Sequence, residues 1–202
     1  MSETTSKRAP RSLSVTRILN VPNQITIARL VLSMVVFVLI PLAQYWSALA
    51  FFVVAAGTDW LDGYLARKYN LVTRLGRILD PFVDKFLICG VFIFLVADYP
   101  KSGIAAWMAV VVVTRELLVT VMRSFLEGEG IDFSAKTAGK VKMVFQCGAV
   151  IISLMALGFA SQTPSWMNWL LTIVVWLAVG STIYSGAAYI WQAIRMMMRP
   201  AD

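Results

Sequence analysis

Long apolar stretches separated by short polar connections dominate this sequence and restrict what the chain can fold into. A helix needs about 20 mostly apolar residues to cross the hydrocarbon core of a bilayer. Of the 202 residues, 59% are hydrophobic and 14% are charged, whereas about a quarter of the residues in soluble domains are charged. We therefore predict an all-α integral membrane protein, a single domain over residues 1–202 that forms a bundle of about six transmembrane helices. The predicted spans lie near 25–43, 46–67, 76–97, 103–126, 138–160 and 165–194.

The basic residues predict the orientation of this bundle. One set of connections carries most of them, and the opposite set carries only Lys101. This asymmetry is the positive-inside pattern, and it places both termini in the cytoplasm. It also accounts for the net charge of +7, so we do not expect binding to nucleic acid. The cytoplasmic set is Lys7, Arg8, Arg11, Arg17, Lys68, Arg74, Lys136, Arg195 and Arg199.

The N-terminal segment, residues 1–20, is polar and basic. No short apolar core with a small-residue cleavage site follows it directly, so it does not have the pattern of a signal peptide. Residues Ser12 to Leu19 are instead expected to form a short interfacial helix before the first span.

The chain contains no histidine, which limits its possible chemistry. The Ser-His-Asp and Cys-His nucleophile systems are excluded, as are metal sites that depend on imidazole. Cys89 and Cys147 lie in apolar runs and are interpreted as packed thiols. Catalysis must then use carboxylates, Lys, Arg, Tyr or hydroxyls, with a hard cation as the expected metal.

Four aspartates lie where the second and third predicted spans meet at a short basic loop. Ionisable groups within a span are costly and are usually functional. At 100° per residue, Asp59 and Asp62 share one face of the second span, and Asp80 and Asp84 share one stripe of the third. Because the two spans are expected to be antiparallel neighbours, the four carboxylates should meet in one pocket near the cytoplasmic boundary.

Four carboxylates in one pocket require positive charge nearby. Oxygen-only ligands favour Mg²⁺, Mn²⁺ or Ca²⁺, and two such ions about 3.5–4 Å apart suit displacement at phosphorus. Gly63, Ala66 and Gly76 lack bulk on the same faces, which leaves room for a ligand. The alternative is a set of buried ion pairs with the neighbouring Arg and Lys side chains, but such pairs usually contribute little to stability.

The aspartates belong to a longer motif, D-x2-D-G-x2-A-R-x8-G-x3-D-x3-D, which runs from Asp59 to Asp84 without departure. It resembles the signature of the CDP-alcohol phosphotransferase family of membrane enzymes, and the resemblance extends over most of the chain. The resemblance implies transfer of a phosphatidyl group from CDP-diacylglycerol to an alcohol, with two divalent cations, Mg²⁺ or Mn²⁺, held by the four aspartates. It further implies that Asp84 is the general base, that the enzyme is a homodimer and that the active site faces the cytoplasm.

The resemblance also assigns residues that would contact the CDP part of the donor. Two of them, Asn23 and Thr26, could equally be residues that start a helix. The full set is Asn23, Thr26, Gly63, Ala66, Arg67, Thr73 and Gly76.

The cations on the cytoplasmic side of the fourth and fifth predicted spans suggest the acceptor. The stretches 58–85, 114–116 and 134–142 are most similar to family members that form phosphatidylglycerophosphate from glycerol 3-phosphate. Arginine binds phosphate through a bidentate fork and lysine as a point charge, although such cations can also be ordinary positive-inside residues. The expected acceptor-binding residues are Arg115, Arg123, Lys136 and Lys140.

Other functions remain open at this point. Inositol phosphate, serine or a second lipid could replace glycerol 3-phosphate with the same chemistry. A cation transporter is less favoured, because the chain lacks the internal repeats that transporter sites usually involve. A non-catalytic scaffold would leave the four aspartates unexplained.

Overall fold

The fold consists of helices alone in the part of the chain that the structure describes. A computed structural model describes residues 21–69, 74–128, 137–159 and 163–198. Within these ranges its six helices confirm the all-α prediction, and their bounds agree with the predicted spans to within a few residues. The predicted interfacial helix, Ser12 to Leu19, lies outside the described residues. In chain order the helices are α2 (Val21–Leu39), α3 (Tyr45–Tyr69), α4 (Arg74–Val96), α5 (Ala106–Gly128), α6 (Thr137–Gly158) and α7 (Ser165–Met197).

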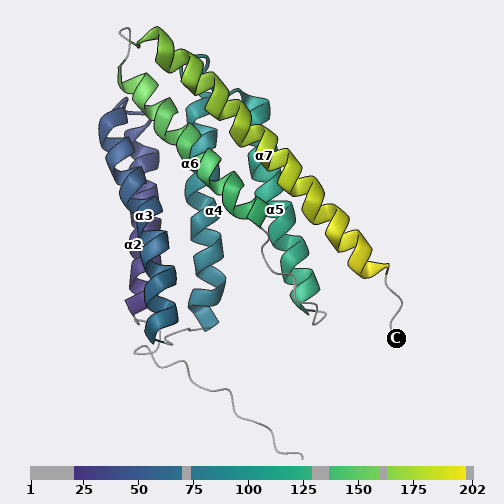
Figure 1. Cartoon of the computed structure of the whole chain (residues 1–202). Helices are drawn as coiled ribbons and strands as arrows, with labels where there is room; N and C mark the ends of the chain where they lie inside the picture. The colour runs from purple at the N-terminus through teal and green to yellow at the C-terminus, as the bar shows by residue number, and fades with distance from the viewer. Residues whose placement is uncertain (1–20, 70–73, 129–136, 160–162, 199–202) are drawn as a thin grey trace, which may run out of the picture.

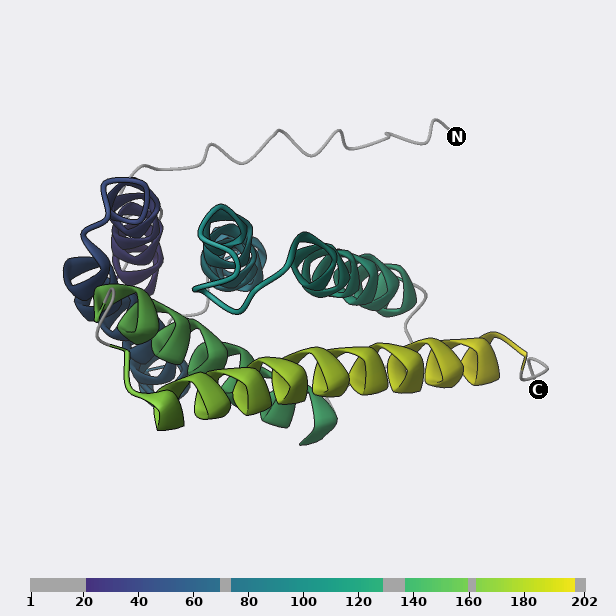
Figure 2. The same cartoon turned by 90° about the horizontal axis from the view of Figure 1, so that it is seen from above.

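Successive helices run in alternating directions, so α3, α5 and α7 end toward the side from which α2, α4 and α6 start (Figure 1). Helix α2 packs against α3 and α4, α6 packs against α3, α4 and α7, and α5 packs against α4 and α7. Seen from above, α6 and α7 lie side by side along one flank of the bundle (Figure 2). We call the end where α2 starts the motif end, because it holds the ends of α3 and α4 that carry the aspartate motif.

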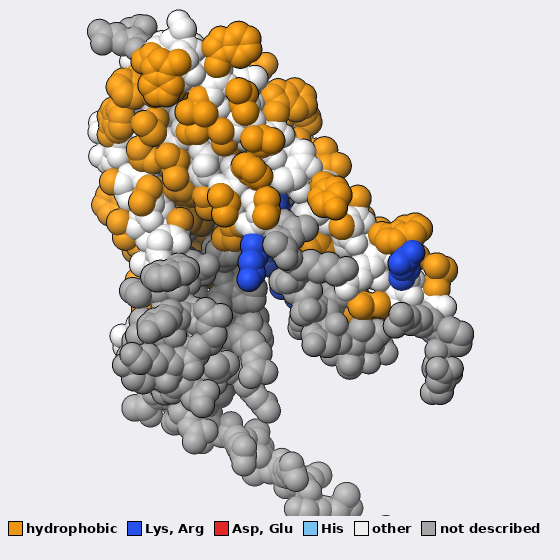
Figure 3. Space-filling model, viewed as in Figure 1, with side chains coloured by type: hydrophobic (Ala, Val, Ile, Leu, Met, Phe, Trp, Pro, Cys, Tyr) orange, Lys and Arg blue, Asp and Glu red, His pale blue; other side chains and the backbone are white. Residues whose placement is uncertain are grey.

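The surface of the described helices fits a lipid environment. Val110, Val121 and Val144 are 63%, 68% and 70% exposed, and apolar side chains cover the upper part of the molecule in Figure 3. Exposed apolar surface of this extent is rare on soluble monomers. Two helical stretches, Gly139–Gly158 and Ser165–Met196, are each long and apolar enough to cross a membrane. The protein is therefore membrane-associated, and the number of spans stays a prediction.

Among the described side chains, the main apolar core lies in the half of the bundle away from the motif end. Helices α2, α4 and α6 contribute to it from their second halves, with Val36, Val91 and Leu154 fully buried. Helices α3 and α7 contribute from their first halves, as Phe52 and Val175 show. A smaller cluster of buried apolar residues joins the second half of α5 to the second half of α7.

Buried hydroxyls close the bundle at the end opposite the motif end. Ser102, in the connection between α4 and α5, donates a hydrogen bond to the carbonyl oxygen of Leu95 at 2.7 Å. The Ser153 hydroxyl of α6 donates to the carbonyl oxygen of Ser102 at 2.8 Å. Leu95 and Ser102 are both fully buried, so their carbonyl oxygens need these hydrogen-bond partners.

Helix α2 also fixes the position of α4. The ring of Phe37 lies directly over Gly90, where a Cβ atom would collide with it. The same ring contacts Phe86 and Phe94, with centroid distances of 5.2 and 5.3 Å. This close approach sets the separation of α2 and α4, and α4 is the helix that carries Asp80 and Asp84.

Candidate active site

The four aspartates of the motif occupy the halves of α3 and α4 that lie at the motif end. Asp59 and Asp62 lie in the second half of α3, and Asp80 and Asp84 lie in the first half of α4. Because the two helices run in opposite directions, both pairs lie toward the same end of the bundle. Their side chains are outside the described part, so the meeting of the four carboxylates stays a prediction. Among the described side chains there is no group of three or more potential metal ligands.

The inward face of α2 changes from polar to apolar along its length. Thr26 and Arg29 are buried in the half of α2 at the motif end, and Ser33 is buried just past its middle. Val36 and, directly after the helix, Ile40 are buried further along. These spacings of three and four residues place all five side chains on one helix face. The polar half of α2 therefore lies in the same half of the bundle as the aspartates.

Arg29 is a functional candidate that the sequence pattern did not single out. Its side chain is only 2% exposed, and its backbone carbonyl oxygen accepts a hydrogen bond from the Ser33 hydroxyl at 2.8 Å. An arginine inside an apolar span is costly. Arg29 lies within the first predicted span, so this cost could have identified it as a candidate from the sequence.

An ion triad links α5 to α6. The Glu116 Oε1 atom accepts a hydrogen bond from Arg115 Nη1 at 3.1 Å and another from Lys142 Nζ. The three side chains are 9% exposed or less. The triad thus brings two cations and one carboxylate together in a buried site. Such a site is stable only while the carboxylate compensates the cations.

The polar layer continues from the triad toward α7. Gln146, one turn after Lys142 on α6, donates from Nε2 to the Thr182 hydroxyl at 2.9 Å. Gln146 and Thr182 are both buried. The middle of α5, the first half of α6 and the middle of α7 therefore share a polar interior.

Comparison with known proteins decides the family. A family model described as CDP-alcohol phosphatidyltransferase matches residues 19–184, which is most of the chain. The chain belongs to the CDP-alcohol phosphatidyltransferase family. Membership in this enzyme family favours catalysis over the transporter and scaffold alternatives. Enzymes of the family depend on divalent cations, and a donor set of four carboxylates fits such hard cations.

Three curated relatives of this phosphatidyltransferase carry the name CDP-diacylglycerol–glycerol-3-phosphate 3-phosphatidyltransferase. The protein from Bacillus subtilis is 36% identical over 197 residues, which cover 87% of this chain and 97% of the relative. The protein from Rickettsia bellii is 36% identical over 174 residues, covering 84% and 93%. The Yersinia pestis protein is 33% identical over 138 residues, covering 66% and 75%. The similarity thus spans nearly the full length of the first two.

The residues predicted to contact the donor are described only in part. Gly63, Ala66 and Arg67 lie on α3 beside the aspartates, and Gly76 lies in the first turn of α4. Thr73 lies outside the described residues. Because α2 starts at Val21, Asn23 and Thr26 lie inside the helix, and buried Thr26 is past the position of a helix-capping residue. The donor contacts themselves stay predictions.

The four cations predicted to bind the acceptor do not share one environment. Arg115 belongs to the buried triad, and Arg123 is half-buried further along α5, with its Nε atom buried and without a hydrogen-bond partner among the described residues. Lys140 is exposed on α6. Lys136 lies outside the described residues. Lys142 is not among the four predicted cations, but it is the lysine that the fold buries beside Arg115 and Glu116.

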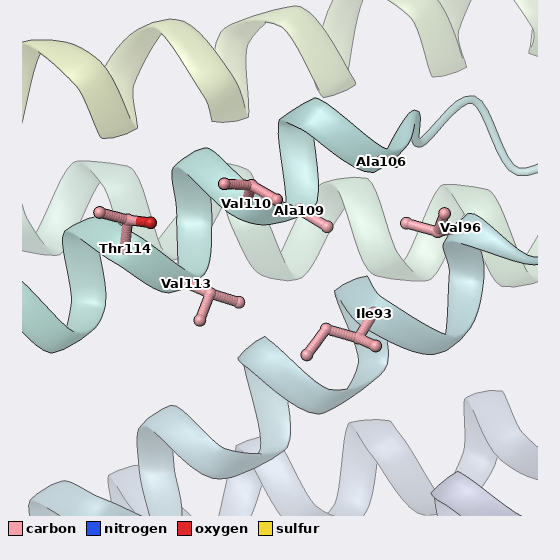
Figure 4. A pocket seen from close by; sticks show the side chains of 7 residues that line it. All are labelled: Ile93, Val96, Ala106, Ala109, Val110, Val113 and Thr114. Atoms are coloured by element: carbon pink, nitrogen blue, oxygen red, sulfur yellow. The ribbon is translucent and has the colours of Figure 1, made fainter.

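A separate apolar pocket lies between α4 and α5 and has a volume of about 330 Å³ (Figure 4). It lies in the half of both helices away from the aspartate motif. It contains no charged side chain, so it offers nothing that would bind phosphate or metal. Its lining residues are Ile93, Val96, Ala106, Ala109, Val110, Val113 and Thr114.

Proposed function

We propose that this phosphatidyltransferase moves the phosphatidyl group from CDP-diacylglycerol to glycerol 3-phosphate, giving phosphatidylglycerophosphate and CMP. The relatives that match nearly end to end carry the name of this reaction. The motif from Asp59 to Asp84 is intact in this chain. The relatives and the motif support the reaction type. The identity of the acceptor alcohol is argued separately, from the residues that would bind it.

The observation that carries the acceptor assignment is the triad of Arg115, Glu116 and Lys142. It holds two cations around one carboxylate in a buried site, where an anion is attracted more strongly than in water. The Nε atom of Arg115 is buried and has no hydrogen-bond partner among the described residues. A phosphate group would supply an acceptor for this atom and bind the guanidinium group in a charge-assisted hydrogen bond.

The proposed chemistry is a direct in-line displacement. Asp84 takes the proton from the C1 hydroxyl of glycerol 3-phosphate while that oxygen attacks the phosphorus that bears diacylglycerol. The new P–O bond forms as the P–O bond to CMP breaks, and CMP leaves with the electron pair. Asp59, Asp62, Asp80 and Asp84 would hold two divalent cations, Mg²⁺ or Mn²⁺, which when bound neutralise the pyrophosphate of the donor. No covalent enzyme intermediate is needed, in keeping with the absence of histidine.

The membrane arrangement belongs to the same proposal. Six spans with both termini in the cytoplasm would place the aspartates and the triad on the cytoplasmic side of the inner membrane. The acyl chains of the donor would then stay in lipid, while glycerol 3-phosphate arrives from water. The Lys and Arg side chains visible in Figure 3 lie along the lower border of the coloured surface, below the apolar upper part. We also propose that the enzyme is a homodimer, as the family resemblance implies.

The proposal is tested with purified protein, CDP-diacylglycerol, Mg²⁺ or Mn²⁺, and a panel of alcohols. CMP release should require both the metal and glycerol 3-phosphate, and mass spectrometry should identify phosphatidylglycerophosphate as the lipid product. Preference for inositol phosphate would keep the chemistry and replace the acceptor. Absence of CMP release with every alcohol, from protein that stays folded, would contradict the proposed activity.

Arg115→Ala should raise the KM for glycerol 3-phosphate by about 10- to 100-fold, because a hydrogen bond to a charged group contributes about 1.5–3 kcal/mol. The KM for CDP-diacylglycerol should stay unchanged. Arg195→Ala is the matched control, since Arg195 is an exposed cation on α7 that lies over the ring of Trp191. An equal rise of both KM values in Arg115→Ala would show that the acceptor pocket is elsewhere.

A further inference from the structure

Helix α7 holds the guanidinium group of Arg115 through the ring of Tyr189. The Arg115 Cζ atom lies 5.4 Å from the centroid of this ring, within the range of a cation–π contact. Tyr189 is only 3% exposed, and it packs with Val119, Leu126 and Ala193 in the smaller apolar cluster. The ring is therefore fixed by its surroundings, and it can fix the cation in turn.

Two glycines, Gly186 and Gly139, provide the space for the side chains of Arg115 and Tyr189. A Cβ atom at Gly186 would lie 3.1 Å from Arg115 Cγ, which is closer than the side chain tolerates without moving. On the other side, a Cβ atom at Gly139 of α6 would lie 3.3 Å from the Tyr189 hydroxyl oxygen. Gly186 and Tyr189 are three residues apart and so lie on the same face of α7.

Arg115 is thus held at three points. Glu116 pairs with its Nη1 atom at 3.1 Å, the Tyr189 ring lies against its guanidinium group, and Gly186 admits its aliphatic stem. An arginine held in this way loses less rotamer entropy when it binds a ligand than a freely rotating one. The orientation of Arg115 consequently depends on α7 as well as on its own helix.

We infer that Tyr189 and Gly186 are positioning residues that set the affinity of the enzyme for its phosphorylated acceptor by orienting Arg115. The inference rests on the proposed function, in which Arg115 binds the phosphate of glycerol 3-phosphate. Both residues lie beyond residue 184, where the match to the family model ends. Acceptor affinity is thereby assigned to a part of α7 outside the matched region.

Tyr189→Leu tests the role of the ring. It should raise the KM for glycerol 3-phosphate by about 2- to 30-fold, the range expected from losing a cation–π contact, and leave the KM for CDP-diacylglycerol unchanged. Tyr189→Phe keeps the ring and should restore the wild-type value. Trp191→Leu removes the comparable but exposed ring beneath Arg195 on the same helix, and it should change neither KM. An equal rise in Tyr189→Phe and Tyr189→Leu would overturn the role of the ring face.

Gly186→Ala tests the space for the Arg115 stem. We expect it to raise the KM for glycerol 3-phosphate several-fold, because the added methyl group displaces Arg115. Gly180→Ala is the matched control on the same helix, since no atom lies within 4 Å of a Cβ built at that position. Both changes raise helix propensity equally, so a difference between them reports the contact with Arg115. Identical kinetics for the two variants would contradict the inference.

A chemical measurement separates this inference from the proposed function. Phenylglyoxal modifies arginine, and peptide mass spectrometry can follow its reaction with Arg115 in folded, detergent-solubilised enzyme. Arg115 should react several-fold faster in Tyr189→Leu than in wild type, Tyr189→Phe or Trp191→Leu. An unchanged rate in Tyr189→Leu would overturn the positioning role even if glycerol 3-phosphate is the acceptor. Conversely, absence of CMP release with glycerol 3-phosphate in the wild type would refute the proposed function, while the modification rate would still report the contact.

Discussion

Asp84→Asn should reduce CMP release from CDP-diacylglycerol and glycerol 3-phosphate by about 100- to 10,000-fold, the usual contribution of a general base. Asparagine has nearly the same shape as aspartate, but it cannot take a proton from the acceptor hydroxyl. It is also a poorer ligand for a divalent cation than a carboxylate. The measurement is the rate of CMP release at saturating concentrations of both substrates and metal.

Asp98→Asn is the matched control for this experiment. Asp98 lies just beyond the opposite end of α4, and its Oδ1 atom accepts a hydrogen bond from the Tyr45 hydroxyl at 3.2 Å. Asparagine keeps that acceptor, so activity should stay near the wild-type value. Substantial activity in Asp84→Asn, with the thermal unfolding midpoint unchanged, would rule out Asp84 as the base.

Glu116→Ala should lower the free energy of unfolding by about 3–5 kcal/mol, which is the usual cost of removing one partner from a buried ion pair. Arg115 and Lys142 would then be two buried cations without their shared carboxylate. The unfolding midpoint of the detergent-solubilised enzyme measures this loss. We expect a decrease of several degrees, because ΔΔG values of this size are large relative to total stability.

The second substitution Lys142→Met separates charge from packing. Methionine keeps most of the length of lysine and removes its charge, so Glu116→Ala combined with Lys142→Met should recover a large part of the lost stability. The two effects should be strongly non-additive, as for residues that share one ion-pair network. Additive losses would show that Glu116 stabilises the fold by packing alone.

The helices could be predicted from sequence because hydropathy and charge act locally. Apolar stretches of bilayer length predict elements that agree with α2 to α7 within a few residues. The spacing of Asp59, Asp62, Asp80 and Asp84 likewise predicts their placement on two consecutive helices, which α3 and α4 confirm. Membership in the family agrees with the motif that contains them.

The cationic site could be predicted only in part, because it depends on packing between helices far apart in sequence. Lys142 meets Glu116 across 26 residues, and nothing local distinguishes it from Lys140, which is exposed. In the sequence, Tyr189 is one of several aromatic residues on the last helix. Only the packing of α5 against α7 shows that its ring lies beside Arg115.

The described core residues lie apart from the aspartate motif along the helices, and this separation has a consequence for evolution and engineering. Helix α4 carries Asp80 and Asp84 in one half and the buried residues Val91, Phe92 and Leu95 in the other. Random mutations in the core half would alter how long the enzyme survives heating without altering which alcohol it uses. Substitutions around the triad could therefore change the acceptor preference. The free energy of folding contributed by the core half of each helix would offset the stability that such substitutions cost.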